Sequence, residues 1–206
     1  MDPDRALVEA AAGGSREAFD ELVRRHQSAV ITLARVLTSG RGDAEDLAQD
    51  VFVRAWRSIG SFRGASTFRT WLHRVAINVI RTSQSRQGRL LRMFTARGGG
   101  EDALDGARRG PAADPASGEE PVDATLARRQ AIDRALAALP DELRVAVTLR
   151  DLQGLDYKEI AEALDVPIGT VESRIFRARQ KLKPLLADLV GGSRTAPTGD
   201  TASGKP

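Results

Sequence analysis

Apolar side chains recur every three or four positions along most of the chain, which is the period of an amphipathic helix. A helical segment is predicted over residues 3–37, with the clearest periodicity from Ser15, a suitable N-cap. Gly40 and Gly42 end this segment, and Asp43 suits the N-cap of a second helix. No stretch alternates convincingly between apolar and polar residues, so the sequence predicts an all-α fold without strands.

A third helix follows a loop over residues 58–66 and carries an apolar stripe from Phe68 to Ile80. Trp71 falls on that stripe, so we expect it in the core. The opposite face is polar and basic. His73 lies on that face, where we expect it to be exposed or to face phosphate, without a catalytic role.

Composition changes over residues 96–122, where Gly, Pro, Ala, Asp and Arg predominate. Such a stretch cannot bury a core, so we interpret it as a flexible linker between two small helical domains. The first domain then spans residues 1–95 and the second spans residues 123–190. Residues 191–206 are rich in Gly, Ser, Thr and Pro and are predicted to form a disordered tail.

The second domain contains the spacing of a helix-turn-helix motif. Residues 156–159 form a capping-box pattern that starts a short helix, with Asp156 in place of Ser or Thr. Small Ala161 permits close helix contact, and a turn over residues 165–167 leads into a second helix. That helix presents a basic outer side, with five bases and no acid over residues 173–187.

Charge is distributed unevenly, although the net charge is only +3. Residues 1–50 carry ten acids and six bases, whereas residues 51–100 carry ten arginines and no acid. A basic window of this kind favours a polyanion such as nucleic acid. A merely solvated basic face is the alternative.

Several classes of protein are disfavoured by what the sequence lacks. There is no cysteine and there are two histidines, so we expect no disulfide, no metal site and no cofactor. No nucleophile–base constellation suggests an enzyme. No apolar run reaches the roughly 18 residues of a membrane span, and the acidic start lacks a signal-peptide pattern. We therefore expect a cytoplasmic protein without membrane insertion.

Two separate parts of the chain resemble extracytoplasmic-function (ECF) sigma factors of the sigma-70 family. The first part carries DAEDLAQDVFVRAW (43–56), FRG (62–64) and TWLHRVAIN (70–78). The second carries LP (139–140), LR (149–150), GL (154–155), EIA (159–161), GTV (169–171) and SRIFRAR (173–179). The resemblance covers about residues 5–95 and 123–187. It implies a non-enzymatic subunit that binds core RNA polymerase and directs promoter-specific transcription initiation, including promoter melting.

The resemblance also implies partners and sites. The first domain (region 2) would dock on the clamp helices of the largest polymerase subunit, and the second (region 4) on the flap region. An anti-sigma factor is a further expected partner. The polymerase-binding candidates are Glu45, Asp46, Gln49, Asp50, Arg54 and Trp56. The acids among them are equally well explained as solvated charges that favour a helix start.

The DNA-binding candidates fall into two groups. For the downstream (minus-10) element they are Phe62, Arg63, Ser66, Thr67, Arg69, Thr70, Arg74, Asn78 and Arg81. For the upstream (minus-35) element they are Thr170, Ser173, Arg174, Phe176, Arg177 and Lys181. At the position of Glu172 the resembled family frequently has a basic or polar residue. The promoter sequence that this chain recognises therefore cannot be inferred from that of a relative.

Two other functions remain open from the sequence. A helix-turn-helix regulator could bind operators without polymerase, and a scaffold or anti-sigma-like adaptor could use the helices for protein contacts alone. The acidic helix followed by the arginine window argues against the first, and the basic recognition helix argues against the second.

Overall fold

The structure is a computed structural model that describes residues 2–40, 43–97 and 122–187. The predicted linker lies almost entirely outside these ranges, and the predicted tail lies wholly outside them. Across the described ranges the protein is helical and contains no strand, so the predicted all-α class is confirmed. The helices are α1 (Arg5–Ala12), α2 (Arg16–Leu37), α3 (Ala44–Ser58), α4 (Phe68–Arg97), α5 (Val122–Ala137), α6 (Asp141–Val147), α7 (Tyr157–Leu164) and α8 (Ile168–Leu185).

Side-chain caps define where several helices begin. The Ser15 hydroxyl accepts a hydrogen bond from the Ala18 N–H at 3.2 Å, and the Asp43 carboxylate accepts from two backbone N–H groups of α3. Both predicted N-caps are therefore confirmed. The break between α1 and α2 was not predicted. It falls at Gly13 and Gly14, and Gly14 adopts a φ of +98° that glycine tolerates without strain.

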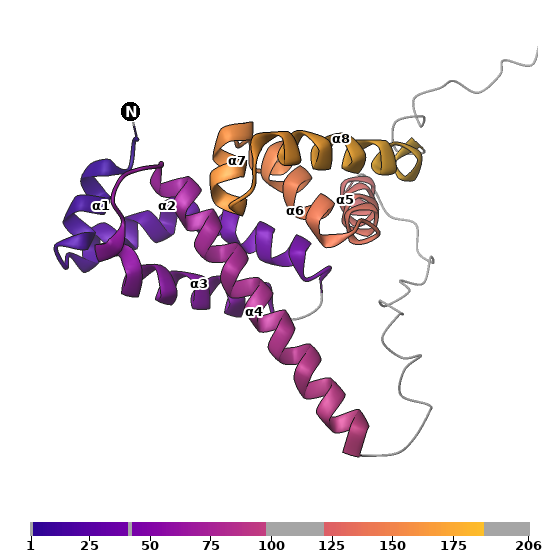
Figure 1. Cartoon of the computed structure of the whole chain (residues 1–206), viewed down its shortest axis with the longest axis horizontal. Coiled ribbons are helices and arrows are strands. Elements are labelled where there is room, and N and C mark those ends of the chain that lie inside the picture. Colours follow the sequence, from indigo (N-terminus) through magenta and orange to yellow (C-terminus); the bar gives the residue numbers. More distant parts are fainter. Residues whose placement is uncertain (1, 41–42, 98–121, 188–206) are drawn as a thin grey trace, which may run out of the picture.

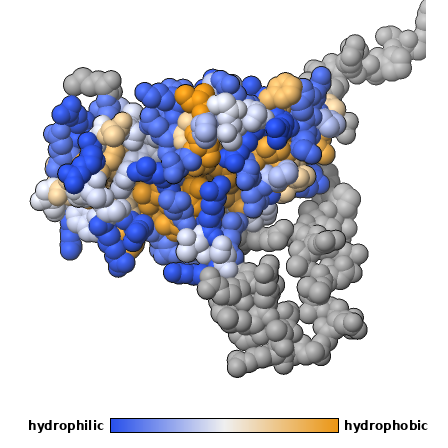
Figure 2. Space-filling view, viewed as in Figure 1, coloured by the Kyte–Doolittle hydropathy of each residue, from blue (hydrophilic) through white to orange (hydrophobic). Residues whose placement is uncertain are grey.

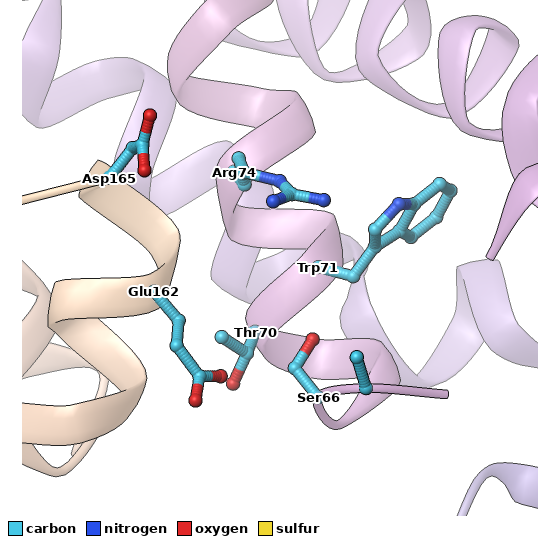
Figure 3. A pocket seen from close by; sticks show the side chains of 7 residues that line it. Ser66, Thr70, Trp71, Arg74, Glu162 and Asp165 are labelled. Carbon is cyan, nitrogen blue, oxygen red and sulfur yellow. The ribbon is translucent and has the colours of Figure 1, made fainter. Parts of the chain in front are cut away.

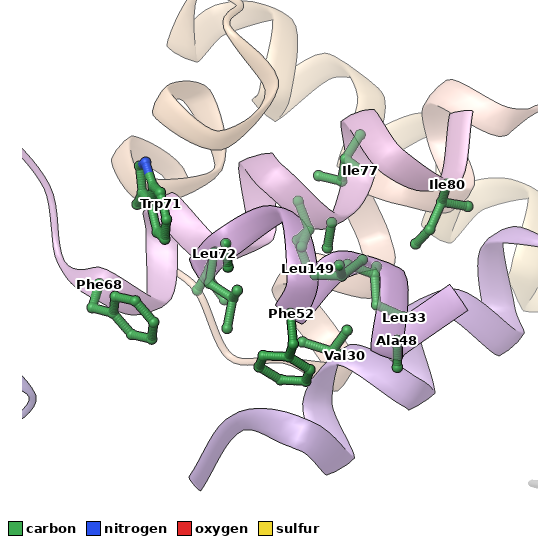
Figure 4. Close-up of a cluster of buried hydrophobic side chains, with 14 of the residues drawn as sticks. Val30, Leu33, Ala48, Phe52, Phe68, Trp71, Leu72, Ile77, Ile80 and Leu149 are labelled. Carbon is green, nitrogen blue, oxygen red and sulfur yellow. The ribbon is translucent and has the colours of Figure 1, made fainter. Parts of the chain in front are cut away.

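The helices form two groups that pack against each other (Figure 1). Helices α1 to α4 make the first group, and α5 to α8 lie against α2 and the first half of α4. The larger of two apolar clusters runs through both groups. Leu149 of the second group is fully buried in the same cluster as Leu33 and Ile77 of the first (Figure 4).

A smaller apolar cluster closes the far side of the second group. Leu136, Leu139 and Leu182 form its centre, and Val36 from the end of α2 packs among them. Hydrophilic side chains predominate on the face of the molecule in Figure 2, and hydrophobic side chains show through near its centre. Because Val36 packs among side chains of the second group, this smaller cluster also joins the two groups.

Aromatic side chains fix the start of α4. Phe68 is fully buried, and its ring lies 5.6 Å from Trp71 and 6.4 Å from Phe62 between centroids. Trp71 is buried, as the sequence predicts. The loop that precedes α4 is therefore anchored by Phe62 on one side and by the helix itself on the other.

The helix-turn-helix geometry of α7 and α8 is also as predicted. Asp156 and Glu159 form a complete capping box, with N–H···O distances of 2.8 and 2.9 Å. Asp165 ends α7 in the left-handed conformation (φ 54°), which turns the chain toward α8. Val171 and Ile175 are buried against α7, so the opposite side of α8 faces outward.

Candidate nucleic-acid interface

The outward side of α8 carries most of the predicted upstream-element residues. Arg177 and Lys181 are exposed, and Phe176 is 64% exposed, which is unusual for an aromatic residue. Thr170 and Ser173 are half-buried, and the Ser173 hydroxyl donates to the Thr170 carbonyl oxygen at 2.9 Å. This end of α8 thus combines an exposed aromatic ring, cationic groups and a hydroxyl.

Two other arginines of α8 are held by acids of the same group of helices. Arg174 donates to the Glu142 carboxylate at 2.8 Å and is only 17% exposed. Arg179 donates twice to Asp151, at 2.6 and 3.2 Å, and this hydrogen-bonded pair raises the pKa of the Arg179 guanidinium. Arg174 must leave Glu142 to reach DNA, so its DNA contact stays a prediction.

The predicted downstream-element residues lie along the loop before α4 and its first turns. Arg63 is exposed, whereas Ser66, Thr67 and Arg69 are half-buried. The Thr67 hydroxyl accepts from the Thr70 N–H at 3.2 Å and so caps the helix. Further along α4, the side chains at the remaining predicted positions are exposed to solvent: Arg74, Asn78 and Arg81.

Two residues of the predicted polar face are buried, because the second group of helices covers them. Thr70 is 2% exposed, and its hydroxyl donates to the Glu159 carboxylate of α7 at 3.3 Å. His73 is 1% exposed, so the expectation that it is exposed or faces phosphate is wrong. The polar face of α4 is therefore divided between an interface with α7 and an open side.

The surroundings of His73 determine which ring nitrogen carries a proton and lower the pKa of the imidazole. Nδ1 lies 2.7 Å from the Arg69 carbonyl oxygen, which can only accept, so Nδ1 carries the proton. Within the described part of the chain, Nε2 has no hydrogen-bond partner. Burial lowers the pKa of the His73 imidazole, and the bond to Arg69 offsets only part of that effect.

A pocket of about 350 Å³ opens where α4 and α7 meet (Figure 3). Ser66, Thr70, Trp71 and Arg74 line its α4 side, with Ala65 beside them, and Glu162 and Asp165 line its α7 side. These two acids could not be found from the sequence, because their position in the same pocket as Arg74 depends on how the two groups of helices pack.

The predicted polymerase-binding residues share the solvent side of α3. Glu45, Asp46, Gln49, Asp50 and Arg54 are all exposed. Trp56 is half-buried instead, with its ring edge-on to Phe19 at 5.0 Å between centroids.

Sequence reasoning missed one residue of the α3 surface. Val53 is 48% exposed and lies one turn from Gln49 and Asp50. The sequence predicted no role for Val53, because an apolar residue is not an obvious part of an acidic surface, and its exposure follows only from the packing.

The described residues contain neither a candidate metal site nor a candidate membrane-spanning helix. No group of three or more His, Cys, Asp or Glu side chains among them could hold a metal ion. Among these same residues, no helix is both long and apolar enough to cross a bilayer.

Two helical units, one of them a helix-turn-helix with an exposed basic side, define a class of DNA-binding transcription proteins. The family description Sigma-70 region 2 matches residues 22–90, and Sigma-70, region 4 matches residues 129–182. The first match falls within α2 to α4, and the second falls within α5 to α8.

Similar proteins agree with the family matches. The ECF RNA polymerase sigma-E factor of Escherichia coli (strain K12) is 40% identical over 190 residues, covering 89% of this chain and 96% of that protein. The protein of the same name from Haemophilus influenzae is 39% identical over 191 residues, covering 89% and 97%.

Solved structures show the same fold. CnrH in complex with the cytosolic domain of CnrY is 29% identical with a TM-score of 0.63, covering 94% of this chain and all of that one. The sigma factor RpoE of Bartonella quintana, in complex with the anti-sigma factor NepR, is 27% identical with a TM-score of 0.65, covering 82% and 96%. The chain belongs to the sigma-70 family, within its ECF group. It is a sigma factor that directs promoter-specific transcription initiation.

Proposed function

We propose that this sigma factor docks on core RNA polymerase through the exposed side of α3 and contacts promoter DNA through two separate surfaces. The loop over residues 62–67 and the open side of α4 contact the downstream element and help to melt it. The first half of α8 enters the major groove of the upstream element. The observation that carries the proposal is the outward side of α8, where Phe176 and Arg177 are exposed while Val171 and Ile175 are buried.

The chemistry of the α8 surface suits base reading. Arginine can form two parallel hydrogen bonds with a guanine edge, and an exposed aromatic or hydroxyl group can contact a thymine methyl or a phosphate. Arg177 is exposed and so is available for this contact. Lys181 lies one turn further along and suits a phosphate contact.

The exposed side of α3 suits a protein interface. Asp46, Gln49, Asp50 and Val53 follow the three- and four-residue spacing of one helix face. An exposed valine next to acidic groups supports docking over a purely solvated helix, because a bare apolar side chain gains by burial. We assign this surface to the polymerase clamp helices and the second domain to the flap region.

The packing of α7 against α4 supports low DNA affinity in the free protein. Thr70, a proposed DNA contact, is buried beneath α7 and bonded to Glu159. Glu162 and Asp165 face the pocket that Arg74 lines, so carboxylates stand where phosphates would bind. Polymerase binding then has to separate the two domains before both DNA surfaces can act.

Specific hydrogen bonds hold the two domains together. The Arg144 guanidinium donates across the interface to the Leu37 carbonyl oxygen at 3.3 Å and to the Ser39 hydroxyl at 2.9 Å. It also donates to carbonyl oxygens within its own group of helices, so its charge stays hydrogen-bonded after separation. Gln153 donates to the Ala29 carbonyl oxygen at 3.3 Å.

We also propose that a protein partner regulates this sigma factor, that it has no catalytic activity and that it acts in the cytoplasm. An anti-sigma factor is the expected regulator, since both solved structures described above are complexes and one of them contains an anti-sigma factor. The chain would act without a cofactor and without catalytic activity of its own. It would work in the cytoplasm, where core polymerase is found.

Single-round transcription tests this proposal directly. Core polymerase is incubated with genomic fragments, with and without the protein, and specific initiation should require both. Asp50→Ala should weaken core binding, whereas Arg177→Ala should keep core binding and lose upstream recognition. DNA binding without core, combined with no initiation in its presence, would refute the proposal and favour a free-standing regulator.

A further inference from the structure

The N-terminal segment is bonded to the start of α4, more than sixty residues away in the chain. Asp2 accepts the Phe68 N–H through Oδ2 at 2.7 Å and the Asp4 N–H through Oδ1 at 3.1 Å. Phe68 is the first residue of α4, whose first N–H groups have no partner within the helix. Asp2 thus satisfies one of them from outside the helix.

Asp4 fixes the position of Asp2. Its carboxylate is 5% exposed and accepts from Arg25 at 3.0 Å, and it lies 2.7 Å from His26 Nε2. The His26 ring in turn meets the Phe68 ring edge-on at 5.4 Å between centroids. The N-terminal segment therefore bonds both to α2 and to the first residue of α4.

Asp2 accepts the N–H of Phe68, the residue that directly follows the loop proposed to contact the downstream element. That loop is tied to α4 by the contacts of Phe62 with Phe68 and Trp71. The fold of α4 itself does not depend on Asp2, because Thr67 caps the Thr70 N–H and the Phe68 side chain is fully buried. The bond from Asp2 acts instead on the junction between loop and helix.

We propose that Asp2 is a positioning residue for DNA contact by the loop over residues 62–67. By holding the Phe68 N–H, it fixes the direction in which the loop leaves α4, and with it the placement of Arg63 and Ser66. The proposal rests on the assignment of this loop to DNA in the proposed function.

The test measures how polymerase carrying each full-length variant binds a fluorescent single-stranded oligonucleotide. The oligonucleotide spans the downstream element of a promoter mapped with the wild-type protein. Asp2→Ala should lower its affinity about fivefold, the size of effect expected when a cap is lost. Asp2→Asn keeps one accepting oxygen, so it should recover most of this loss.

Ser15→Ala is the matched control, because it removes an equivalent cap from α2, away from the loop. It should leave oligonucleotide affinity unchanged, while core binding stays unchanged in all three variants. Equal losses in Asp2→Ala and Ser15→Ala would reduce Asp2 to a general stabilising role and overturn the inference.

Arg63→Ala tests separately whether the loop over residues 62–67 contacts DNA, which the role of Asp2 requires. A loss of affinity with Arg63→Ala but not with Asp2→Ala overturns the role of Asp2 alone. No loss with Arg63→Ala overturns the assignment of the loop to DNA, and the role of Asp2 falls with it.

Discussion

Arginines on α8 differ in role because their neighbours differ. Arg177 is exposed, whereas Arg174 and Arg179 are paired with acids of their own group of helices. An arginine held by a carboxylate contributes to the fold and must break that pair to reach a phosphate or base. Which arginines are paired depends on the positions of Glu142 and Asp151. Both acids belong to other segments, so the sequence of α8 alone does not reveal the pairing.

Substitution of Arg177 and Arg179 should separate DNA reading from stability. Arg177→Ala should weaken holoenzyme binding to the upstream element by about 1–3 kcal/mol, with the melting temperature unchanged. Arg179→Ala should lower the free energy of unfolding by up to about 1 kcal/mol, because its pair with Asp151 is partly exposed. Thermal unfolding and promoter-binding titrations measure the two effects, and a larger stability loss in Arg177→Ala would contradict the assignment.

His73 should make the stability of the protein sensitive to mild acid. Burial lowers the pKa of the His73 imidazole in the fold below its ordinary value of about 6.5, so the unfolded chain binds the proton first as pH falls. The free energy of unfolding should therefore decrease below about pH 6.5. Urea unfolding at several pH values should show a smaller decrease in His73→Gln, and identical pH dependence in the two proteins would refute this role.

Individual caps were predictable from the sequence, whereas the burial of polar side chains on α4 was not. Ser15, Asp43 and Asp156 act on backbone groups two or three residues away, so a short pattern contains all the information needed. Thr70 and His73 are buried by helices that follow them by some eighty residues. No local pattern distinguishes a polar face that meets water from one that meets another domain.

The α7–α8 pair shows how helix ends set the geometry of a DNA-binding element. A capping box begins α7, and a left-handed residue at Asp165 ends it, so the turn directs α8 outward. The sequence predicted this motif well because caps and turns are local. It missed the π-helical turn at Thr148–Leu152, which packs against α6 and α7 and has no comparable local signature.

Removal of the capping box should destabilise the helix-turn-helix. Asp156→Ala should lower the free energy of unfolding by about 1 kcal/mol, because the Glu159 N–H loses its acceptor. For a protein of this size, that corresponds to about 2–4 °C in melting temperature. Asp156→Ser is the control and should stay near the wild-type value in calorimetry. An equally large decrease in the melting temperature of Asp156→Ser would show that loss of the cap does not cause the destabilisation.

At the scale of the described part of the molecule, the larger apolar cluster continues from one domain into the other. Leu149, Ile160 and Ile175 of the second domain share an apolar cluster with residues of the first. The sequence predicted the two helical domains, and a shared core between them follows only from their packing. The same contact hides Thr70, so the structure links the packing of the domains to the availability of a DNA surface.

A reversible cross-link between the domains tests this link most directly. The chain has no cysteine, so Ala29→Cys and Gln153→Cys introduce one thiol on each side of the interface, outside every proposed DNA contact. A short disulfide-containing linker would join them, and each single-cysteine variant would serve as the control. Single-round transcription with core polymerase is then measured before and after reduction. We predict no promoter-specific transcript while the linker is intact and full recovery once it is cleaved. Equal transcription by the linked and the reduced protein would contradict the claim that the domains must separate.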